Sequence, residues 1–239
     1  MKLIPFRGRL TVLAWVNAVV HAGGLVLAAV GMRPGSPLVL LPERLAYLAQ
    51  GPLAWSLGWG MWMVCAMALI AFLAGMASRL PEHTLLAHSA LVLAIVGGAV
   101  DLLCDVINII VLPALAAGGP SWETMFLTAE HTTFAGGSIV ANGLYSVSVA
   151  LLTWCYQSRQ GIKAPTVVLG YAVFGFGMLL ALAGFLGSPR LAELATGPTI
   201  GLFCVWSVSV ARWLENADRV QGARSEAPDC RQDGCSPHQ

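Results

Sequence analysis

Charged residues are scarce in this chain: Asp, Glu, Lys and Arg make up only 10% of its 239 residues, whereas 57% are hydrophobic. Soluble domains typically carry about 25% charged residues, so the chain lacks the polar surface that an aqueous fold needs. The formal net charge is +1, and no basic stripe with interleaved aromatic residues is present, which argues against a nucleic-acid partner. The composition predicts that the main partner is the lipid bilayer.

Catalytic and cofactor motifs are also missing. The sequence contains no G-x-S-x-G, H-E-x-x-H or P-loop pattern. Cys65, Cys104, Cys155 and Cys204 each stand alone in an apolar run, so no disulfide framework is expected. Haem ligation by two histidines needs a facing pair inside the membrane, and His21 alone lies deep in an apolar run. No enzymatic activity and no cofactor are therefore predicted.

Six apolar runs are long enough to cross a bilayer as helices, which takes about 20 residues. Clusters of Pro, Gly and charged residues separate them. The sequence therefore predicts an all-α, polytopic bundle of six transmembrane helices in residues 1–214, followed by a flexible cytoplasmic tail at 215–239. The predicted spans are residues 10–31, 53–77, 85–112, 134–156, 165–187 and 195–214.

The distribution of Lys and Arg predicts how the bundle is oriented. Of the 13 basic residues, all but Arg33, Arg44 and Arg190 fall at the two ends of the chain or in the second and fourth connections between spans. Cytoplasmic connections carry the excess of positive charge. Both termini are therefore predicted to be cytoplasmic, in a bacterial inner membrane.

The amino end has a second interpretation. Basic residues precede an apolar run that passes through Val20-His21-Ala22, which resembles the cleavage site of a signal peptide. Asn17 interrupts the apolar core and the run continues to Val30, so a first transmembrane helix is favoured.

A short amphipathic helix is expected between the first two spans, at residues 38–50. Its leucines recur near helical spacing, with charged residues on the other faces. We expect this helix to lie along the outer interface.

Two carboxylates stand inside the third apolar run. Each costs about 2.5–3.5 kcal/mol at the bilayer centre if it stays charged, so the chain must bury them against something. Asp101, Asp105 and Asn108 are spaced i, i+4, i+7, which places them on one narrow helix face with Cys104 at its edge.

A second polar stripe is expected at the start of the fourth span, on the same outer side. His131, Ser138, Asn142 and Tyr145 follow at helical spacing, and Glu130 precedes them. If the two stripes converge, protonatable groups beside a histidine suit proton coupling or cation capture. The alternative is purely structural, because intramembrane Asp and Asn often hydrogen-bond neighbouring helices, and an outer arginine can pair with an acid.

The polar tail offers a separate, weaker metal site. Cys230, Cys235 and His238 are soft ligands, but the C-x4-C spacing is looser than that of a typical zinc knuckle.

Several short motifs resemble those of a group of uncharacterised bacterial multipass membrane proteins. The resemblance covers about residues 10–214 and implies a six-helix fold without implying any chemistry. The residues that carry it are Leu57-Gly58-Trp59 with Trp62, Asp101 with Val111-Leu112-Pro113, Asn142-Gly143-Leu144-Tyr145, and Ser188-Pro189-Arg190.

These patterns favour a small ion- or proton-coupled transporter. Asp101, Asp105 and Glu130 would then serve as proton or cation ligands. Asn108, His131 and Asn142 would orient them. The alternatives are a non-catalytic membrane scaffold or accessory subunit, in which the same residues hold helices together, and a metal-stress accessory protein that uses the tail cysteines.

Overall fold

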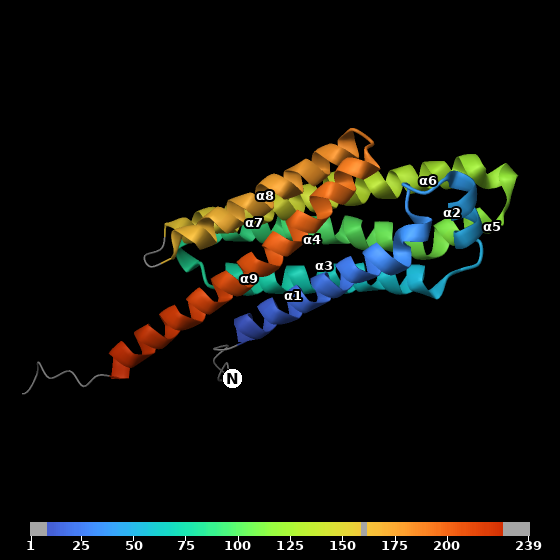
Figure 1. Cartoon of the computed structure of the whole chain (residues 1–239). Helices are drawn as coiled ribbons and strands as arrows, with labels where there is room; N and C mark the ends of the chain where they lie inside the picture. The colour runs from blue at the N-terminus through green and yellow to red at the C-terminus, as the bar shows by residue number, and fades with distance from the viewer. Residues whose placement is uncertain (1–8, 159–161, 227–239) are drawn as a thin grey trace, which may run out of the picture.

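Figure 1 shows a computed structural model of the protein, which describes residues 9–158 and 162–226. This part of the chain is almost wholly helical and has no strand, so the predicted all-α class is confirmed. Six helical segments are long and apolar enough to cross a membrane, which fits an integral membrane protein. They are Leu10–Gly35, Leu53–Ala77, Thr84–Ala117, Pro120–Gln157, Ala164–Phe185 and Pro189–Ala217.

Three of the six spans contain a π-helical turn, in which the backbone bonds run from i to i+5. The other helices are α2 (Leu41–Leu48), α3 (Leu53–Ala77), α8 (Ala164–Phe185) and α9 (Pro189–Glu226). In the first span, α1 (Arg9–Leu27) is followed by the turn Ala28–Met32. In the third span, the turn Ile107–Val111 joins α4 (Thr84–Val106) to α5 (Leu112–Ala117). In the fourth span, the turn Gly136–Ala141 joins α6 (Glu123–Ala135) to α7 (Asn142–Gln157).

Two helices extend well beyond the boundaries predicted from hydropathy. The fourth span begins at Pro120 rather than Phe134, so its 38 residues measure about 57 Å at 1.5 Å per residue. The last helix continues past Leu214 to Glu226, so the first part of the predicted flexible tail is helical. A fall in hydropathy shows where a helix leaves apolar surroundings, whereas its backbone hydrogen bonds can continue into water.

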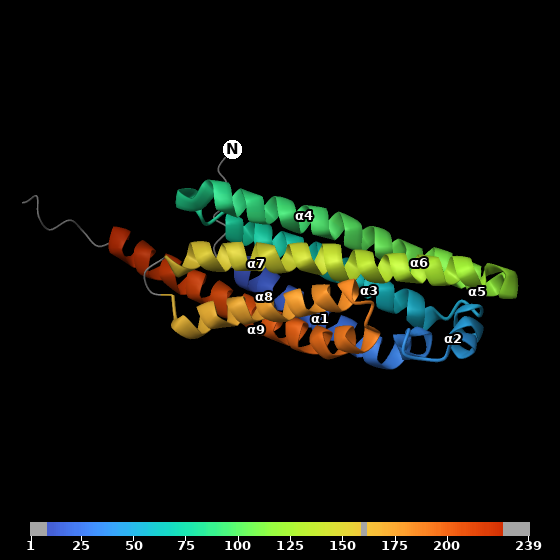
Figure 2. The ribbon, with the colours of Figure 1, turned by 90° about the horizontal axis from the view of Figure 1, so that it is seen from above.

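The six spans form a closed ring, because each packs on its neighbours along the chain and the last returns to the first (Figures 1 and 2). Around the ring the order is α1, α3, α4, α7, α8 and α9. Both views show that α5 and α6 reach past the turn between α8 and α9, at the end of the bundle that carries α2. The expected amphipathic helix is α2, which packs on α5.

Buried apolar side chains fill the two ends of the ring separately. The cluster nearer the chain termini includes Phe72, Tyr156, Phe203 and Trp206. The Phe72 and Trp206 rings meet edge to face with centroids 6.1 Å apart, and the Tyr156 hydroxyl donates to the Met76 carbonyl at 2.8 Å. The opposite end holds a second cluster around Trp55 and α2.

A glycine seam joins α8 to α7 and its preceding π-helical turn. Gly170, Gly177 and Gly184 are seven residues apart, and they face Thr153, Ser146 and Ser138 respectively. A Cβ atom at Gly177 would lie 2.9 Å from the Ser146 Cβ, and one at Gly184 would lie 2.6 Å from the Ser138 Cβ. Small residues at such spacing let transmembrane helices approach closely, which maximises dispersion contacts between them.

We predict that Gly177→Ala destabilises the protein by about 1–3 kcal/mol, because the added methyl overpacks the seam. Gly175→Ala on the same helix is the matched control, since a Cβ there meets no atom within 4 Å. Thermal unfolding in lipid nanodiscs measures both variants. Equal melting temperatures for the two variants would contradict the close packing of α7 on α8.

Candidate functional site

A cavity of about 600 Å³ lies inside the ring. Its outer part is lined by exposed residues, among them Leu38 and Glu193, so it is open at the end where α9 begins. Its inner part is lined by Val149, Val173 and Phe203, which belong to the apolar cluster near the chain termini. The cavity therefore enters the bundle from one side and stops at packed apolar side chains.

The polar face of α4 forms one wall of this cavity. Asp101, Asp105 and Asn108 all line it, as their spacing predicts for a continuous helix. The Asp101 carboxylate accepts a hydrogen bond from the Tyr145 hydroxyl at 3.2 Å, and the Asn108 Oδ1 accepts one from the Thr133 hydroxyl at 3.4 Å. Asp105 is 1% exposed, and its Oδ2 has no hydrogen-bond partner among the described residues.

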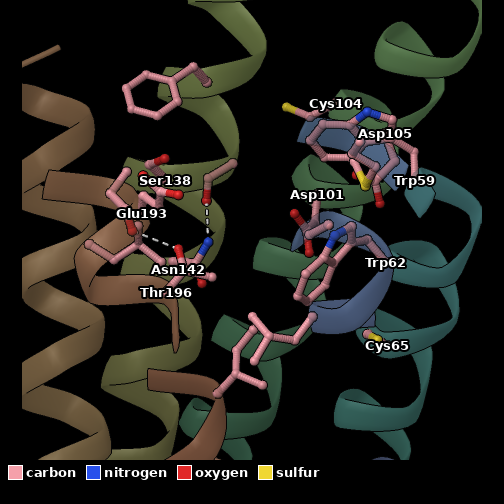
Figure 3. A pocket seen from close by; sticks show the side chains of 18 of the residues that line it. Trp59, Trp62, Cys65, Asp101, Cys104, Asp105, Ser138, Asn142, Glu193 and Thr196 are labelled. Carbon is pink, nitrogen blue, oxygen red and sulfur yellow. Dashed lines mark hydrogen bonds between the residues drawn. The ribbon is translucent and has the colours of Figure 1, made fainter. Parts of the chain in front are cut away.

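The opposite wall comes from the π-helical turn before α7, from α7 and from α9. Figure 3 shows Ser138, Asn142, Glu193 and Thr196 across the cavity from Asp101. The Asn142 side chain donates to the Gly137 carbonyl at 2.8 Å, so its position is fixed by its own helix. Acidic groups therefore line both walls of the cavity.

Aromatic rings form much of the remaining surface. Trp59 and Trp62 of α3 lie on the α4 side of the cavity (Figure 3). His21 of α1 is edge-on to Trp62 and to Phe203, with ring centroids 6.4 and 5.3 Å apart. Its Nδ1 donates to the Asn17 carbonyl at 2.8 Å, so the pair Asn17 and His21 sets the orientation of the imidazole.

All three π-helical turns contribute cavity residues. Met32 comes from the first turn, Asn108 from the second, and Gly137 and Ser138 from the third. Such turns widen a helix by one residue and are frequent at functional sites. Here each of them contributes residues to the cavity wall.

Pro113 accounts for the backbone pattern of the second turn. The Leu112 N–H bonds to the Ile107 carbonyl, five residues back. In this pattern the Asn108 carbonyl would receive its bond from residue 113, which is proline and has no N–H. The Trp55 indole N–H donates to the Asn108 carbonyl instead, at 2.7 Å.

His131 lies away from the other predicted site residues. It is exposed and is not among the residues that line the cavity. In an uninterrupted helix it would share the face of Ser138 and Asn142, but the π-helical turn Gly136–Ala141 inserts one extra residue. One residue corresponds to about 100° of helix rotation, so the stripe continues through Glu130 and Thr133 instead.

Glu130 is held by an ion pair. The Arg44 guanidinium of α2 donates to its carboxylate at 2.8 Å, and the two side chains are only 8% and 14% exposed. Arg44 also lies over the Phe126 ring, 5.8 Å from its centroid. The pair fastens α2 to α6 beside the cavity mouth, as the structural interpretation of the outer arginines expects.

The predicted tail ligands Cys230, Cys235 and His238 lie outside the described residues. Within residues 9–158 and 162–226, no group of three or more His, Cys, Asp or Glu side chains is placed to hold a metal ion.

Several cavity residues escaped the sequence prediction. Glu193 precedes the apolar window from which the sixth span was predicted, and Thr196 lies at its start. Trp59 and Trp62 resemble ordinary interfacial tryptophans. A usable signal was nevertheless present: Glu193, Thr196 and Phe203 recur at i, i+3 and i+10, which places them on one face of a helix.

Comparisons with known proteins do not add to this description, because no protein-family model, curated protein or solved structure matches the chain.

The arrangement suits reversible binding of a proton or a cation. Carboxylates line both walls, and aromatic rings form much of the surface between them. A low-dielectric setting strengthens their attraction for a positive charge, while the open end admits it from water.

We predict that water reaches Cys104, which lines the cavity, but not Cys155, which is 0% exposed and is not among the lining residues. Two single-cysteine proteins, with the other five cysteines replaced by alanine, are treated in nanodiscs with 2-aminoethyl methanethiosulfonate. Intact-mass spectrometry should show modification of Cys104 alone. An unmodified Cys104 would mean that the cavity is closed to water.

We also predict that Arg44 and Glu130 stabilise the fold as a coupled pair. Loss of one partner leaves an uncompensated buried charge, which costs about 3–5 kcal/mol. Arg44→Gln and Glu130→Gln should each lower the melting temperature, and the double variant should lose less than the two single losses together. Strictly additive losses in this double-mutant cycle would exclude a direct interaction.

Proposed function

We propose that the protein is a small ion- or proton-coupled transporter whose binding site is the cavity between α4 and α9. The observation that carries this proposal is an acid-lined cavity inside the ring, open at one end and blocked at the other by packed apolar side chains. A purely structural bundle gains nothing from a void of about 600 Å³ lined with carboxylates, because each buried acid must be desolvated.

In this mechanism the carboxylates of Asp101 and Asp105 take up and release the coupling proton or cation. The Tyr145 hydroxyl, bonded to Asp101 at 3.2 Å, orients that acid and stabilises its charged form. Asn108 and Asn142 supply neutral polar groups along the cavity walls. Glu130 is assigned a positioning role, because its charge is already matched by Arg44.

Alternating access requires the blocked end to open. The barrier there is the aromatic group of Phe72, Phe203 and Trp206, whose rings lie 6.0–6.5 Å apart. We assign the hinge to α9, where Pro198 stands inside the helix between Gly197 and Gly201. Pro removes a backbone hydrogen bond and weakens the helix at that level, beside cavity residues such as Thr196.

The proposed setting is a bacterial inner membrane, with both termini cytoplasmic. The basic residues Arg79 and Lys163 lie beside helix ends on the side of the chain termini, whereas Arg33 and Arg44 lie at the opposite end. Arg212 lies within α9, over the Trp15 ring near the start of α1. By the positive-inside rule, the cavity then opens to the outer side.

A membrane scaffold or accessory subunit is the second candidate. It is favoured by the hydrogen bonds that link cavity residues of different helices, Asp101 to Tyr145 and Asn108 to Thr133. In that role the acids contribute only to packing.

Asp105→Asn separates the two candidates. The protein is reconstituted in liposomes that contain a pH-sensitive dye, with the membrane potential clamped, and pools of small cationic, neutral and anionic solutes are added. A coupled transporter shows solute-dependent proton movement that Asp105→Asn lowers at least tenfold, because the amide cannot exchange a proton. Glu123→Gln, an exposed acid outside the cavity, is the matched control and should retain full flux.

The scaffold candidate predicts a different result. No solute pool then moves protons through the wild-type protein, and Asp105→Asn changes only the melting temperature. That outcome would refute the transporter proposal.

A further inference from the structure

Two buried polar atoms on residues that line the cavity have no hydrogen-bond partner among the described residues. One is the Oδ2 of Asp105, an acceptor on a side chain that is only 1% exposed. The other is the Nε1 of Trp59, a donor. Buried polar groups in native structures are nearly always hydrogen-bonded, so this acceptor and this donor together indicate that a bound molecule completes the site.

The sign of the charge that the cavity prefers follows from its lining. Asp101 and Asp105 lie on one wall and Glu193 on the other (Figure 3). Among the lining residues the one Arg or Lys is Arg33, which is exposed at the mouth and therefore screened by water. Arg44 already balances Glu130. The remaining acids favour a cationic ligand.

The size and chemistry of the cavity favour a small organic molecule over a bare metal ion as its substrate. A volume of about 600 Å³ falls in the range of sites for small organic molecules. The donor set contains no grouping of three metal ligands within the described residues. Trp59, Trp62 and Phe203 instead present aromatic surface, which binds both apolar bodies and organic cations.

The Asp105 oxygen without a hydrogen-bond partner narrows the class of ligand further. It needs an N–H or O–H donor, which a protonated amine has and a quaternary ammonium ion lacks. The Trp59 N–H needs an acceptor oxygen. We infer that the cavity binds a protonated organic amine that carries an apolar body and a hydroxyl or ether oxygen. This inference rests on the proposed function and names its substrate class.

In the bound state the ammonium group donates to the Asp105 carboxylate, and the oxygen of the ligand accepts from the Trp59 indole. The apolar body lies between Trp62 on the α3 side of the cavity and Phe203 at its floor. No covalent bond forms or breaks in this step, so the ligand is bound noncovalently and reversibly.

Binding is tested by calorimetry on the full chain in lipid nanodiscs, with 2-amino-1-phenylethanol as the probe. Two probes of similar size serve as controls: its N,N,N-trimethylammonium analogue, which lacks the N–H donor, and 1-phenylethane-1,2-diol, which lacks the charge. We expect the amine to bind at least tenfold more tightly than either control. This comparison uses the unaltered protein, so a folding defect cannot explain the result.

Asp105→Asn should weaken amine binding at least tenfold, while Glu123→Gln should leave it unchanged. Tight binding of the trimethylammonium analogue or of the diol, or absence of amine binding to the wild type, would overturn the inference. In that case water alone satisfies the two atoms.

Failure of this inference is distinguishable from failure of the transport proposal. Amine binding without any amine-dependent flux supports the ligand class and refutes transport. Flux with other solutes, and none with amines, supports transport and overturns the ligand class. Neutral amines cross bilayers unaided, so protein-free liposomes and Asp105→Asn set the baseline.

Discussion

The need to satisfy every backbone polar group inside a membrane governs this structure. Lipid offers no hydrogen bonds, so an interruption in a transmembrane helix persists only where side chains replace the lost partners. In each of the three π-helical turns a side chain binds a backbone carbonyl: Tyr47 donates to that of Gly31, Trp55 to that of Asn108 and Asn142 to that of Gly137, at 2.7–2.8 Å. The Asn108 carbonyl loses its backbone donor because residue 113 is proline, whereas the Gly137 carbonyl also accepts the Asn142 backbone N–H. The three widened turns supply cavity-lining residues, among them Met32, Asn108 and Ser138.

The sequence was informative wherever the backbone is regular. Hydropathy identifies all six spans. The i, i+4 spacing places Asp101 and Asp105 together because both lie in the uninterrupted α-helix α4, and Asn108 stays on their face because it lies only two residues into the π-helical turn. It failed at His131, where the register depends on a single inserted residue. Pattern arguments assume a constant rotation per residue, and a π-helical turn breaks that assumption without changing composition. The adjacent Gly136 and Gly137 are the only trace of it in the sequence.

Contacts between distant segments were the second limit. The pairing of Arg44 with Glu130 joins residues 86 positions apart, and it depends on α2 folding back onto α5 and α6. Spacing rules describe one helix at a time, so they list the outer arginines as partners without choosing among them. The available partner then decides the role: the Glu130 carboxylate is paired with a guanidinium at 2.8 Å, whereas the Oδ2 of Asp105, a residue that lines the cavity, has no hydrogen-bond partner among the described residues.

The two halves of the bundle differ in how they are held together, and this difference limits which half can move. Near the chain termini, aromatic rings interlock and Gly170 brings α8 close to Thr153 of α7, so separation there loses many close dispersion contacts between helices. Around the cavity, individual polar contacts such as Arg44 to Glu130 join the elements. A ligand that binds both cavity walls would draw α9 toward α4 and transmit force along α9, through Pro198, to Phe203 and Trp206. The closed end can respond to the cavity's contents through α9, because Phe203, which lines the cavity floor, and Trp206, whose ring packs against it, both lie on that helix.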